Sequence, residues 1–373
     1  MLIPSTAWFA CLLGSASLQR RSGPATPRCQ IGCSSSELSS LPALGAHGAL
    51  LKGEARAAER GKSAFRSRPD ARVRLFALYG VADSAIAMRK WASSAPDWLE
   101  VRVLELPGHG YRSDEPLPPC SERAREAVDG AELVRQRSAW ICSLADEIIE
   151  VQACTLDAKA PAPFAFVGFS FGALVAYELV REIARRGSQS PLALFALGRG
   201  APHAVTLSTR RIRELQRYDD EAVLSYQKAL GFDSDKIAPS MRPRAASLFR
   251  AGCLLGAVHI GDPYDTDGVP NLWDNIRQPM PHASGVPGVD CHVYGITAER
   301  DICWPPSLVR RWRDVPSRGY EDFELPDTAH EQLRNSPDAM AFVFERLASL
   351  AEEQATNAKR LAEILAVVTL GEL

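Results

Sequence analysis

The stretch PFAFVGFSFGALVAYELVREI, residues 163–183, decides the fold. Its first part is an apolar run typical of a buried β-strand, and the part after Gly172 has the spacing of a helix. Between them, the run from Gly168 to Gly172 has the pattern Gly-x-Ser-x-Gly around Ser170. A turn as tight as this strains the backbone of the serine and exposes its hydroxyl. Only glycine fits at the positions two residues before and two residues after the serine. The order strand, turn and helix predicts that Ser170 is a nucleophile; the alternative is a serine in an ordinary glycine turn.

The composition is that of a globular protein. The chain has 373 residues, of which 46% are hydrophobic and 24% charged, enough for one large α/β core with an insertion. A formal net charge of −2 gives no electrostatic reason to expect nucleic acid or anionic lipid as a partner. The nine cysteines include no Cys-x-x-Cys pair, so we expect neither a disulfide framework nor a bound metal. No apolar run reaches the roughly 18 residues that a membrane-spanning helix needs.

Residues 1–70 differ in kind from the rest of the chain. An apolar stretch at 7–13 is followed by small residues and by Arg20 and Arg21, and no acidic residue occurs before Glu37. This pattern predicts a targeting segment, which would route the protein to a plastid, a mitochondrion or the secretory pathway. The alternative is a disordered extension without an address on a cytoplasmic protein. In either case we expect no contribution to the fold.

From residue 71 onward, apolar strands alternate with helices, which predicts a mainly parallel sheet flanked by helices. The expected strands are 73–79, 99–106, 163–167, 192–197, 289–295 and 319–325. The expected helices between them are 85–95, 139–151 and 173–183. A last helix should begin with Ser336 as its N-cap and Pro337 as its first residue. We therefore expect one domain over 71–350 and a helical tail over 351–373.

The stretch from about 205 to 285 breaks this alternation. It holds two expected helices, 211–229 and 243–257, and no convincing strand. Helices inserted between core strands predict a lid over the carboxyl edge of the sheet. A separate small helical domain is the alternative, but the strand pattern resumes afterwards.

The partners of a serine nucleophile can be sought by their position. A serine hydroxyl attacks well when an imidazole takes its proton and a carboxylate orients that imidazole. In the α/β-hydrolase plan these follow in the order Ser, Asp or Glu, His, each in a loop after a strand. Asp301 follows the strand 289–295, and His330 lies after the strand 319–325 and before the last helix. We predict Asp301 as the acid and His330 as the base, with Glu299 as the alternative acid.

The oxyanion hole of such an enzyme is built from backbone N–H groups. One donor should be the N–H of Phe171, directly after the nucleophile. The other should come from Gly80 or Val81, in the turn after the first core strand.

Three ordered motifs carry a resemblance to a known family. They are LELPGHGYR at 104–112, GFSFGALVAYE at 168–178 and LGRGAPH at 197–203. Together, over about residues 72–350, they resemble the type II thioesterases, the stand-alone editing enzymes of polyketide and nonribosomal peptide synthesis. That family is related to the medium-chain thioesterases of fatty acid synthase.

The resemblance implies an α/β-hydrolase fold with a helical lid and a triad of Ser170, Asp301 and His330. It also implies hydrolysis of acyl groups from the phosphopantetheine thiols of acyl or peptidyl carrier proteins, or from acyl-coenzyme A. The phosphopantetheine arrives with the substrate, so no cofactor is expected. We expect a monomer. A general carboxylesterase or lipase and a non-catalytic binding protein of the same fold are the alternatives.

The chain departs from the family pattern at two places. The family usually has a Pro-aromatic-Ala-Gly-Gly turn after the first strand, whereas this chain has Tyr-Gly-Val-Ala-Asp at 79–83. The family usually has Gly-Gly-His followed by aromatic residues, whereas here Thr-Ala precedes His330 and Glu331 follows it. The geometry of the turn at 79–83 is therefore not expected to follow the family's, and Glu331, beside His330, should affect the histidine or the pocket entrance.

Overall fold

The computed structural model describes most of the chain from Arg68 to Gly371. The described residues are 68, 70–115, 130–153, 162–203, 217–256, 288–315 and 317–371. All of them belong to one compact unit, which spans Ala43–Leu373. The expected targeting segment, apart from residues 68 and 70, lies outside the described residues. So do residues 205–216 and 257–285 of the expected lid.

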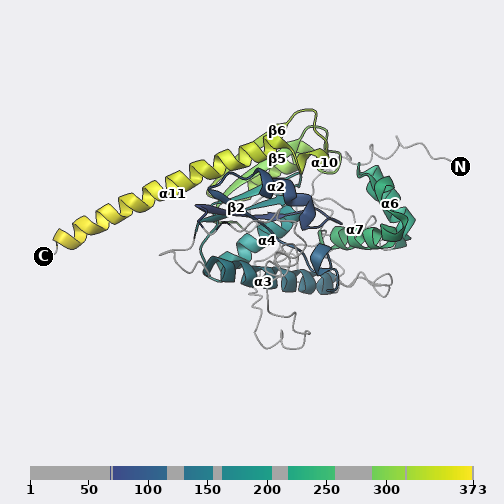
Figure 1. Ribbon diagram of the computed structural model, residues 1–373, viewed down its shortest axis with the longest axis horizontal. Coiled ribbons are helices and arrows are strands. Elements are labelled where there is room, and N and C mark those ends of the chain that lie inside the picture. The colour runs from purple at the N-terminus through teal and green to yellow at the C-terminus, as the bar shows by residue number, and fades with distance from the viewer. Residues whose placement is uncertain are drawn as a thin grey trace, which may run out of the picture. The chain divides into compact units, whose positions relative to one another are not determined.

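Six parallel strands form the central sheet, in the order β2-β1-β3-β4-β5-β6 (Figure 1). They are β1 (Val73–Leu78), β2 (Leu99–Val103), β3 (Phe164–Phe169), β4 (Ala193–Leu197), β5 (His292–Ala298) and β6 (Gly319–Leu325). Every residue of β1, β3 and β4 is buried, because helices cover both faces of the sheet. This explains why these strands are apolar runs, interrupted only by Arg74 of β1, which pairs with Glu100. The predicted fold class is confirmed.

Three strands differ from the prediction by more than one residue, and the first of them is β3, which ends at Phe169 rather than at residue 167. Strand β2 ends at Val103 rather than at residue 106, and Glu105 lies in the turn beyond it, with its carboxylate buried. Strand β5 lies three residues later than predicted and pairs with β4 from His292 onward. As a result, Asp301 lies only three residues beyond the end of β5.

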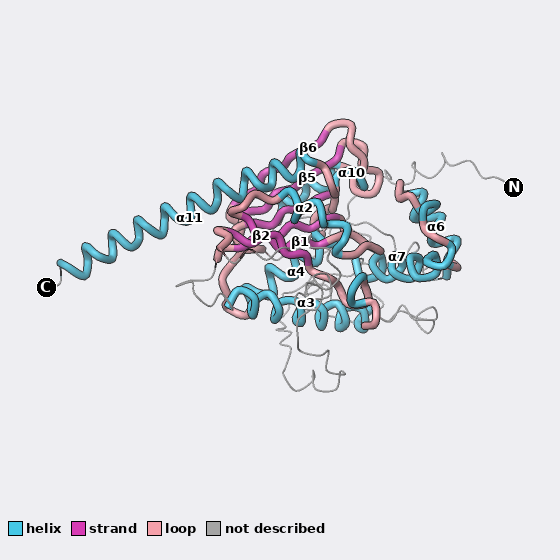
Figure 2. The backbone as a smooth tube through the Cα atoms, in the orientation of Figure 1, coloured by secondary structure: helices cyan, strands magenta, loops and turns pink. Residues whose placement is uncertain are grey.

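Helices cover both faces of the sheet, as Figures 1 and 2 show. On one face, α3 (Gly130–Ala153) packs against α4 (Phe171–Arg185), which contacts β1, β3 and β4. On the other face lie α2 (Arg89–Ser94) and α11 (Pro337–Gly371), where the rings of Trp91 and Phe344 meet edge to face. The short helices are η3 (Ala85–Met88), η4 (Gly110–Arg112), η6 (Ser234–Lys236), η7 (Pro239–Met241), α9 (Pro306–Val309), η9 (Arg310–Asp314) and α10 (His330–Leu333).

The described part of the insertion between β4 and β5 contains two main helices; the second lies within one residue of its predicted bounds, whereas the first begins at Asp220 rather than at residue 211. They are α6 (Asp220–Ala229) and α7 (Arg242–Gly256). Asp219 caps α6, because its side chain accepts a hydrogen bond from the Ala222 N–H. The two helices enclose a small apolar core of their own, formed by Val223, Leu224, Ala246 and Phe249.

Helix α11 begins as predicted and runs through the expected boundary at 350 without interruption. Ser336 is its N-cap, and the Ser336 hydroxyl accepts from the Ala339 N–H at 3.3 Å. Residues 352–364 of the helix are all exposed, including Leu361 and Ile364. Nowhere in the described part of the chain is a helix both long and apolar enough to cross a membrane.

Candidate active site

The turn around Ser170 joins β3 to α4 and has the geometry of a nucleophile elbow. Ser170 has φ 51° and ψ −119°, a conformation that residues other than glycine rarely adopt. A Cβ on Gly168 would lie 2.4 Å from the backbone of Ala173, and one on Gly172 would lie 2.6 Å from the carbonyl oxygen of Leu78. Side-chain atoms do not approach a backbone so closely, so the turn requires glycine at both positions.

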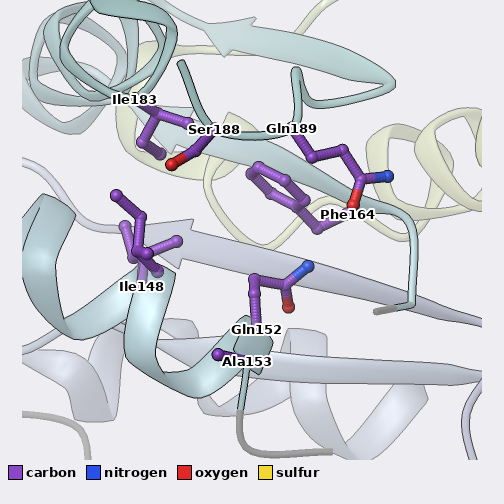
Figure 3. Close-up of a pocket in the computed structure, with 8 residues that line it drawn as sticks. Ile148, Gln152, Ala153, Phe164, Ile183, Ser188 and Gln189 are labelled. Carbon is purple, nitrogen blue, oxygen red and sulfur yellow. The ribbon is translucent and has the colours of Figure 1, made fainter. Parts of the chain in front are cut away.

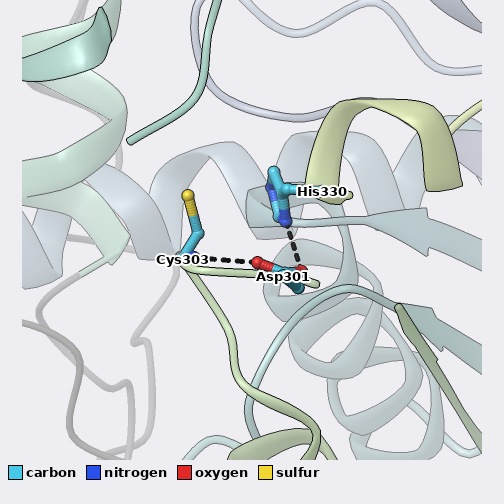
Figure 4. Close-up of side chains that lie close together, drawn as sticks. All are labelled: Asp301, Cys303 and His330. Carbon is cyan, nitrogen blue, oxygen red and sulfur yellow. Dashed lines mark hydrogen bonds and ion pairs between the residues drawn. The ribbon is translucent and has the colours of Figure 1, made fainter. Parts of the chain in front are cut away.

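Asp301 and His330 form a buried hydrogen-bonded pair (Figure 4). Oδ2 of Asp301 lies 2.6 Å from Nδ1 of His330. The other carboxylate oxygen, Oδ1, accepts from the backbone N–H groups of Cys303 and Trp304, each at 2.8 Å. One carboxylate oxygen of Asp301 is thus held by two backbone N–H groups, and the other oxygen holds the imidazole of His330. This pairing places a proton on Nδ1 and leaves the Nε2 lone pair available.

Ser170 lies at the same edge of the sheet as this pair. Ser170, Asp301 and His330 follow β3, β5 and β6, and the carboxyl ends of parallel strands meet at one edge. The ring of Phe169, beside Ser170, lies 4.8 Å from the ring of His330. Nε2 of His330 is buried and has no hydrogen-bond partner among the described residues. The structure therefore places the three residues that the sequence singles out at one edge of the sheet, and it brings two of them, Asp301 and His330, into contact.

The alternative acid, Glu299, is exposed and engaged elsewhere. Its Oε2 accepts a hydrogen bond from the Asp327 N–H at 2.8 Å. Glu299 therefore links the loop after β5 to the loop before His330, and the geometry favours Asp301 as the partner of His330.

The other described histidines have different surroundings. The Nδ1–H of His109 donates to the Pro107 carbonyl at 2.9 Å, and burial lowers the His109 pKa to about 4. His203 lies 3.2 Å from Asp314, and His292 is part of β5. The three remaining histidines of the sequence lie outside the described residues.

The predicted oxyanion donors border the serine. Phe171 is the first residue of α4, so its N–H has no acceptor within the helix. Gly80 and Val81 form the turn after β1, and a Cβ on Gly80 would lie 3.4 Å from the Cβ of Ser170. Ala82, the next residue of the turn, has φ 59°. This turn is called the oxyanion turn below and comprises residues 80–83.

The inserted helices lie directly over this site. The ring of Phe232, just after α6, meets the ring of His330 edge to face at 5.8 Å. The thiol of Cys303 donates to the Leu230 carbonyl at 3.1 Å. A Cβ on Gly252 of α7 would lie 2.5 Å from the side chain of Val81, so α7 packs tightly on the oxyanion turn. The insertion therefore packs against both the imidazole of His330 and the oxyanion turn.

Asp301, Cys303 and His330 also form the one cluster of metal-ligand types in the described residues, with ligand atoms within 4.8 Å of one another. The contacts favour a different role. Asp301 is already bonded to His330, and burial raises the pKa of the Cys303 thiol, which disfavours the thiolate that a metal requires. The cluster suits an acid and imidazole pair better than a metal site.

A separate hollow of about 210 Å³ lies at the opposite edge of the sheet (Figure 3). Phe164, at the start of β3, is part of its wall, whereas Ser170 follows the end of the same strand. The lining residues are apolar or uncharged: Ile148, Ile149, Gln152, Ala153, Phe164, Ile183, Ser188 and Gln189. The hollow has no acid or base and takes no part in the chemistry at Ser170.

Sequence reasoning missed the support beneath the oxyanion turn. The buried carboxylate of Glu105 accepts from the Tyr79 hydroxyl at 2.5 Å and from the Ala85 N–H at 3.1 Å, and burial raises the pKa of Glu105. A Cβ on Gly110 would lie 2.1 Å from Oε2 of Glu105, so the Pro-Gly-His-Gly turn closes tightly around that carboxylate. The signal available in the sequence was the position of Glu105 just before the glycine-rich turn at 107–110.

Comparisons with known proteins agree with this description. The model of the thioesterase domain family matches residues 124–224, the segment that contains Ser170. The gramicidin S biosynthesis protein GrsT of Aneurinibacillus migulanus is 30% identical over 133 residues, 35% of this chain and 42% of that protein. The medium-chain S-acyl fatty acid synthase thioesterase of Rattus norvegicus is 28% identical over 155 residues, 42% of this chain and 49% of that protein. The chain thus spans less than half of the length of these curated relatives.

Among solved structures, the thioesterase RedJ from the prodiginine biosynthetic pathway of Streptomyces coelicolor has a similar fold. Its TM-score is 0.52 at 23% sequence identity, over 76% of this chain and 88% of RedJ. The segment around Ser170 therefore matches the thioesterase family, and the chain has the fold found in type II thioesterases, as its sequence motifs predict.

Proposed function

We propose that this protein hydrolyses acyl thioesters and that Ser170, His330 and Asp301 act as its catalytic triad. The observation that carries the proposal is the buried contact of 2.6 Å between Asp301 and His330 at the edge of the sheet where the elbow presents Ser170. A carboxylate held by two backbone N–H groups keeps its partner imidazole in one tautomer, which leaves Nε2 to act as the base.

The reaction then follows from these positions. Nε2 of His330 takes the proton of the Ser170 hydroxyl while Oγ attacks the thioester carbonyl carbon. The N–H of Phe171 and one from Gly80 or Val81 stabilise the oxyanion. The carbon–sulfur bond breaks, and the imidazolium returns its proton to the departing sulfur, which leaves as a thiol. Water, deprotonated by His330, attacks the acyl-enzyme and releases the carboxylic acid and free Ser170.

The substrate that we propose is an acyl group on the phosphopantetheine thiol of a carrier protein, with acyl-coenzyme A as a poorer donor. The names of the relatives support this class, since they come from gramicidin S biosynthesis, fatty acid synthase and the prodiginine pathway. The position of α6 and α7 over His330 supports it further, because a folded carrier could contact these helices while its arm reaches Ser170. Such remote contacts can lower the barrier at the reacting carbon.

The test compares four donors of one acyl group with the full chain as the enzyme. The donors are the acyl carrier protein, coenzyme A, a short acyl thiol and the p-nitrophenyl ester. We expect the carrier protein to have the highest kcat/KM and the short thiol to have a lower kcat as well as a higher KM. Fastest turnover of the p-nitrophenyl ester would indicate a general esterase. No turnover of any donor would indicate a non-catalytic binding protein.

A further inference from the structure

Two side chains that depart from the family pattern meet at one arginine. Arg334 follows α10, the short helix that begins with His330. The Arg334 guanidinium pairs with Asp83 of the oxyanion turn and lies 3.3 Å from Oε2 of Glu331. One cation therefore links the turn that carries the oxyanion donors to the loop that carries the base, although Asp83 and Arg334 are 251 residues apart in sequence.

The arginine is held from several sides. Its guanidinium lies over the ring of Phe169, 5.8 Å from the centroid, and that ring also contacts the imidazole of His330. The Arg334 carbonyl accepts from the Trp91 indole N–H at 2.8 Å, which fixes the backbone at this point. Phe169 thus lies between the base and the cation and directly precedes Ser170.

The oxyanion turn needs such an anchor. Ala82 has φ 59°, a conformation that costs a residue with a side chain free energy and persists only where the surroundings impose it. Asp83 uses one carboxylate oxygen to accept from the Ser84 N–H at 3.0 Å and the other to bind Arg334. Burial raises the pKa of Asp83 while the charge of Arg334 opposes that rise, so loss of Arg334 would leave a partly buried carboxylate without its counter-charge.

We propose that Asp83, Arg334 and Glu331 form a positioning clamp that fixes the oxyanion turn relative to His330 and so sets the distance between the oxyanion donors and the base. The inference rests on the proposed function. The three residues are positioning residues, because none of them contacts the reacting atoms.

The clamp has a larger effect on rate than on stability. Partly exposed ion pairs contribute little to folding, typically about 0 to 1 kcal/mol. Misplacement of a reacting group by about 1 Å can cost on the order of 100-fold in rate. Loss of the clamp should therefore lower kcat about 10- to 100-fold, with KM changed less than about threefold.

The experiment compares Asp83→Asn, Arg334→Gln and their double variant in the full chain. Asn keeps the oxygen that accepts from the Ser84 N–H, but it replaces the oxygen that binds Arg334 by an NH2 group, so both the charge and the acceptor are lost. Because both changes break one contact, the double variant should be no slower than the slower single variant. Asp83→Glu keeps the charge and should recover part of the rate.

The matched control is Arg346→Gln. The Arg346 guanidinium pairs with Glu321 at 2.6 Å and lies over the Phe342 ring at 4.9 Å, a similar arrangement on α11 and β6, away from the site. We expect its kcat to stay within about twofold of wild type, with melting temperatures of all variants within a few degrees. Equal losses in control and clamp variants, additive losses in the double variant, or full kcat in Asp83→Asn would overturn the clamp.

A fluorophosphonate probe separates this inference from the proposed function. Ser170 Oγ would bond to phosphorus as fluoride leaves and His330 takes the proton, and the phosphonyl oxygen would occupy the oxyanion hole. Wild type should label rapidly and the clamp variants about 10- to 100-fold more slowly. If wild type neither labels nor hydrolyses thioesters, the proposed function fails; if wild type and clamp variants react equally fast, the clamp alone fails.

Discussion

The nucleophile elbow and the oxyanion turn lie side by side, at the carboxyl ends of the neighbouring strands β3 and β1, and they are held in different ways. Each contains a residue with a side chain at positive φ, Ser170 in the elbow and Ala82 in the turn. The elbow is fixed by backbone crowding around Gly168 and Gly172. The oxyanion turn is fixed by side chains from distant parts of the chain, among them Arg334.

The difference shows why one half of the site is visible in the sequence and the other is not. Backbone crowding demands glycine at fixed spacing, and this leaves a five-residue signature. An ion pair or a packing contact between residues that are hundreds of positions apart in the sequence leaves no local pattern. The substitutions below test whether the two halves differ as described, beginning with the largest expected effect.

Ser170→Ala removes the chemistry of the elbow and leaves its shape. We expect kcat for an acyl thioester to fall on the order of 10⁴-fold or more, because only residual binding and oxyanion stabilisation would remain. Ser190→Ala is the control, since Ser190 is a serine before β4 that bonds to Asp290 at 3.0 Å. Retention of more than about a tenth of the wild-type rate in Ser170→Ala would place the nucleophile elsewhere.

Asp301→Asn tests the acid that orients the base. The amide would favour the wrong imidazole tautomer, so kcat should fall about 10³- to 10⁴-fold. Glu299→Gln is the matched control in the same loop and should stay within about threefold of wild type, because Glu299 is exposed and bonds only to the backbone at Asp327 in the described structure. The reverse ranking would make Glu299 the acid.

Gly172→Ala and Ala82→Gly compare the two kinds of support directly. The new Cβ at 172 would lie 2.6 Å from two backbone carbonyl oxygens, so we expect a loss of about 3 kcal/mol or more in the free energy of unfolding. Glycine at position 82 relieves the backbone strain at φ 59°, but it also raises the conformational entropy of the unfolded chain. Because these two effects oppose each other, the free energy of unfolding should change by no more than about 1 kcal/mol. Denaturant unfolding measures both. Similar losses at the two positions would refute the contrast.

Much of the fold could be predicted from the sequence, and the reasons are physical. Strands β1, β3 and β4 are buried on both faces, so each appears as an apolar run that periodicity detects. Strand β5 was misplaced by three residues, since the extent of a strand depends on pairing with β4, which a local pattern does not contain. Helix α11 passes the expected domain boundary because a helix continues wherever its residues allow it.

In the candidate site, too, the features that leave a local sequence pattern could be predicted and those that depend on distant residues could not. The contact between Asp301 and His330 could be anticipated because each follows a strand of a parallel sheet. The contact between Asp83 and Arg334 could not, because the two residues lie 251 positions apart in the sequence. Glu105 was marked only by the glycine-rich turn that follows it, and its partner Tyr79 comes from another element. Long-range side-chain contacts are the part of a site that a single sequence leaves open.

The smallest expected effect is a loss of folding stability in acid that arises beneath the oxyanion turn. The ring of His109 lies 5.8 Å from that of Tyr79, which leads into the oxyanion turn, and burial lowers the His109 pKa from 6.5 to about 4. Between these values the unfolded chain binds more protons than the folded one, so stability falls as the pH drops from 6.5 towards 4. Between pH 7 and pH 5 this histidine should account for a loss of about 2 kcal/mol.

His109→Asn tests this directly, because Asn can still donate to the Pro107 carbonyl and does not titrate. The variant should be less stable than wild type at pH 7, yet it should lose less stability between pH 7 and pH 5. The raised pKa of Glu105 acts in the opposite direction, since a folded state that binds its proton more readily gains stability in acid, but it does so in both proteins and cancels in the comparison. Unfolding free energies at the two pH values measure the difference. An equal loss in wild type and variant would mean that His109 is not the acid-sensitive support beneath the oxyanion turn.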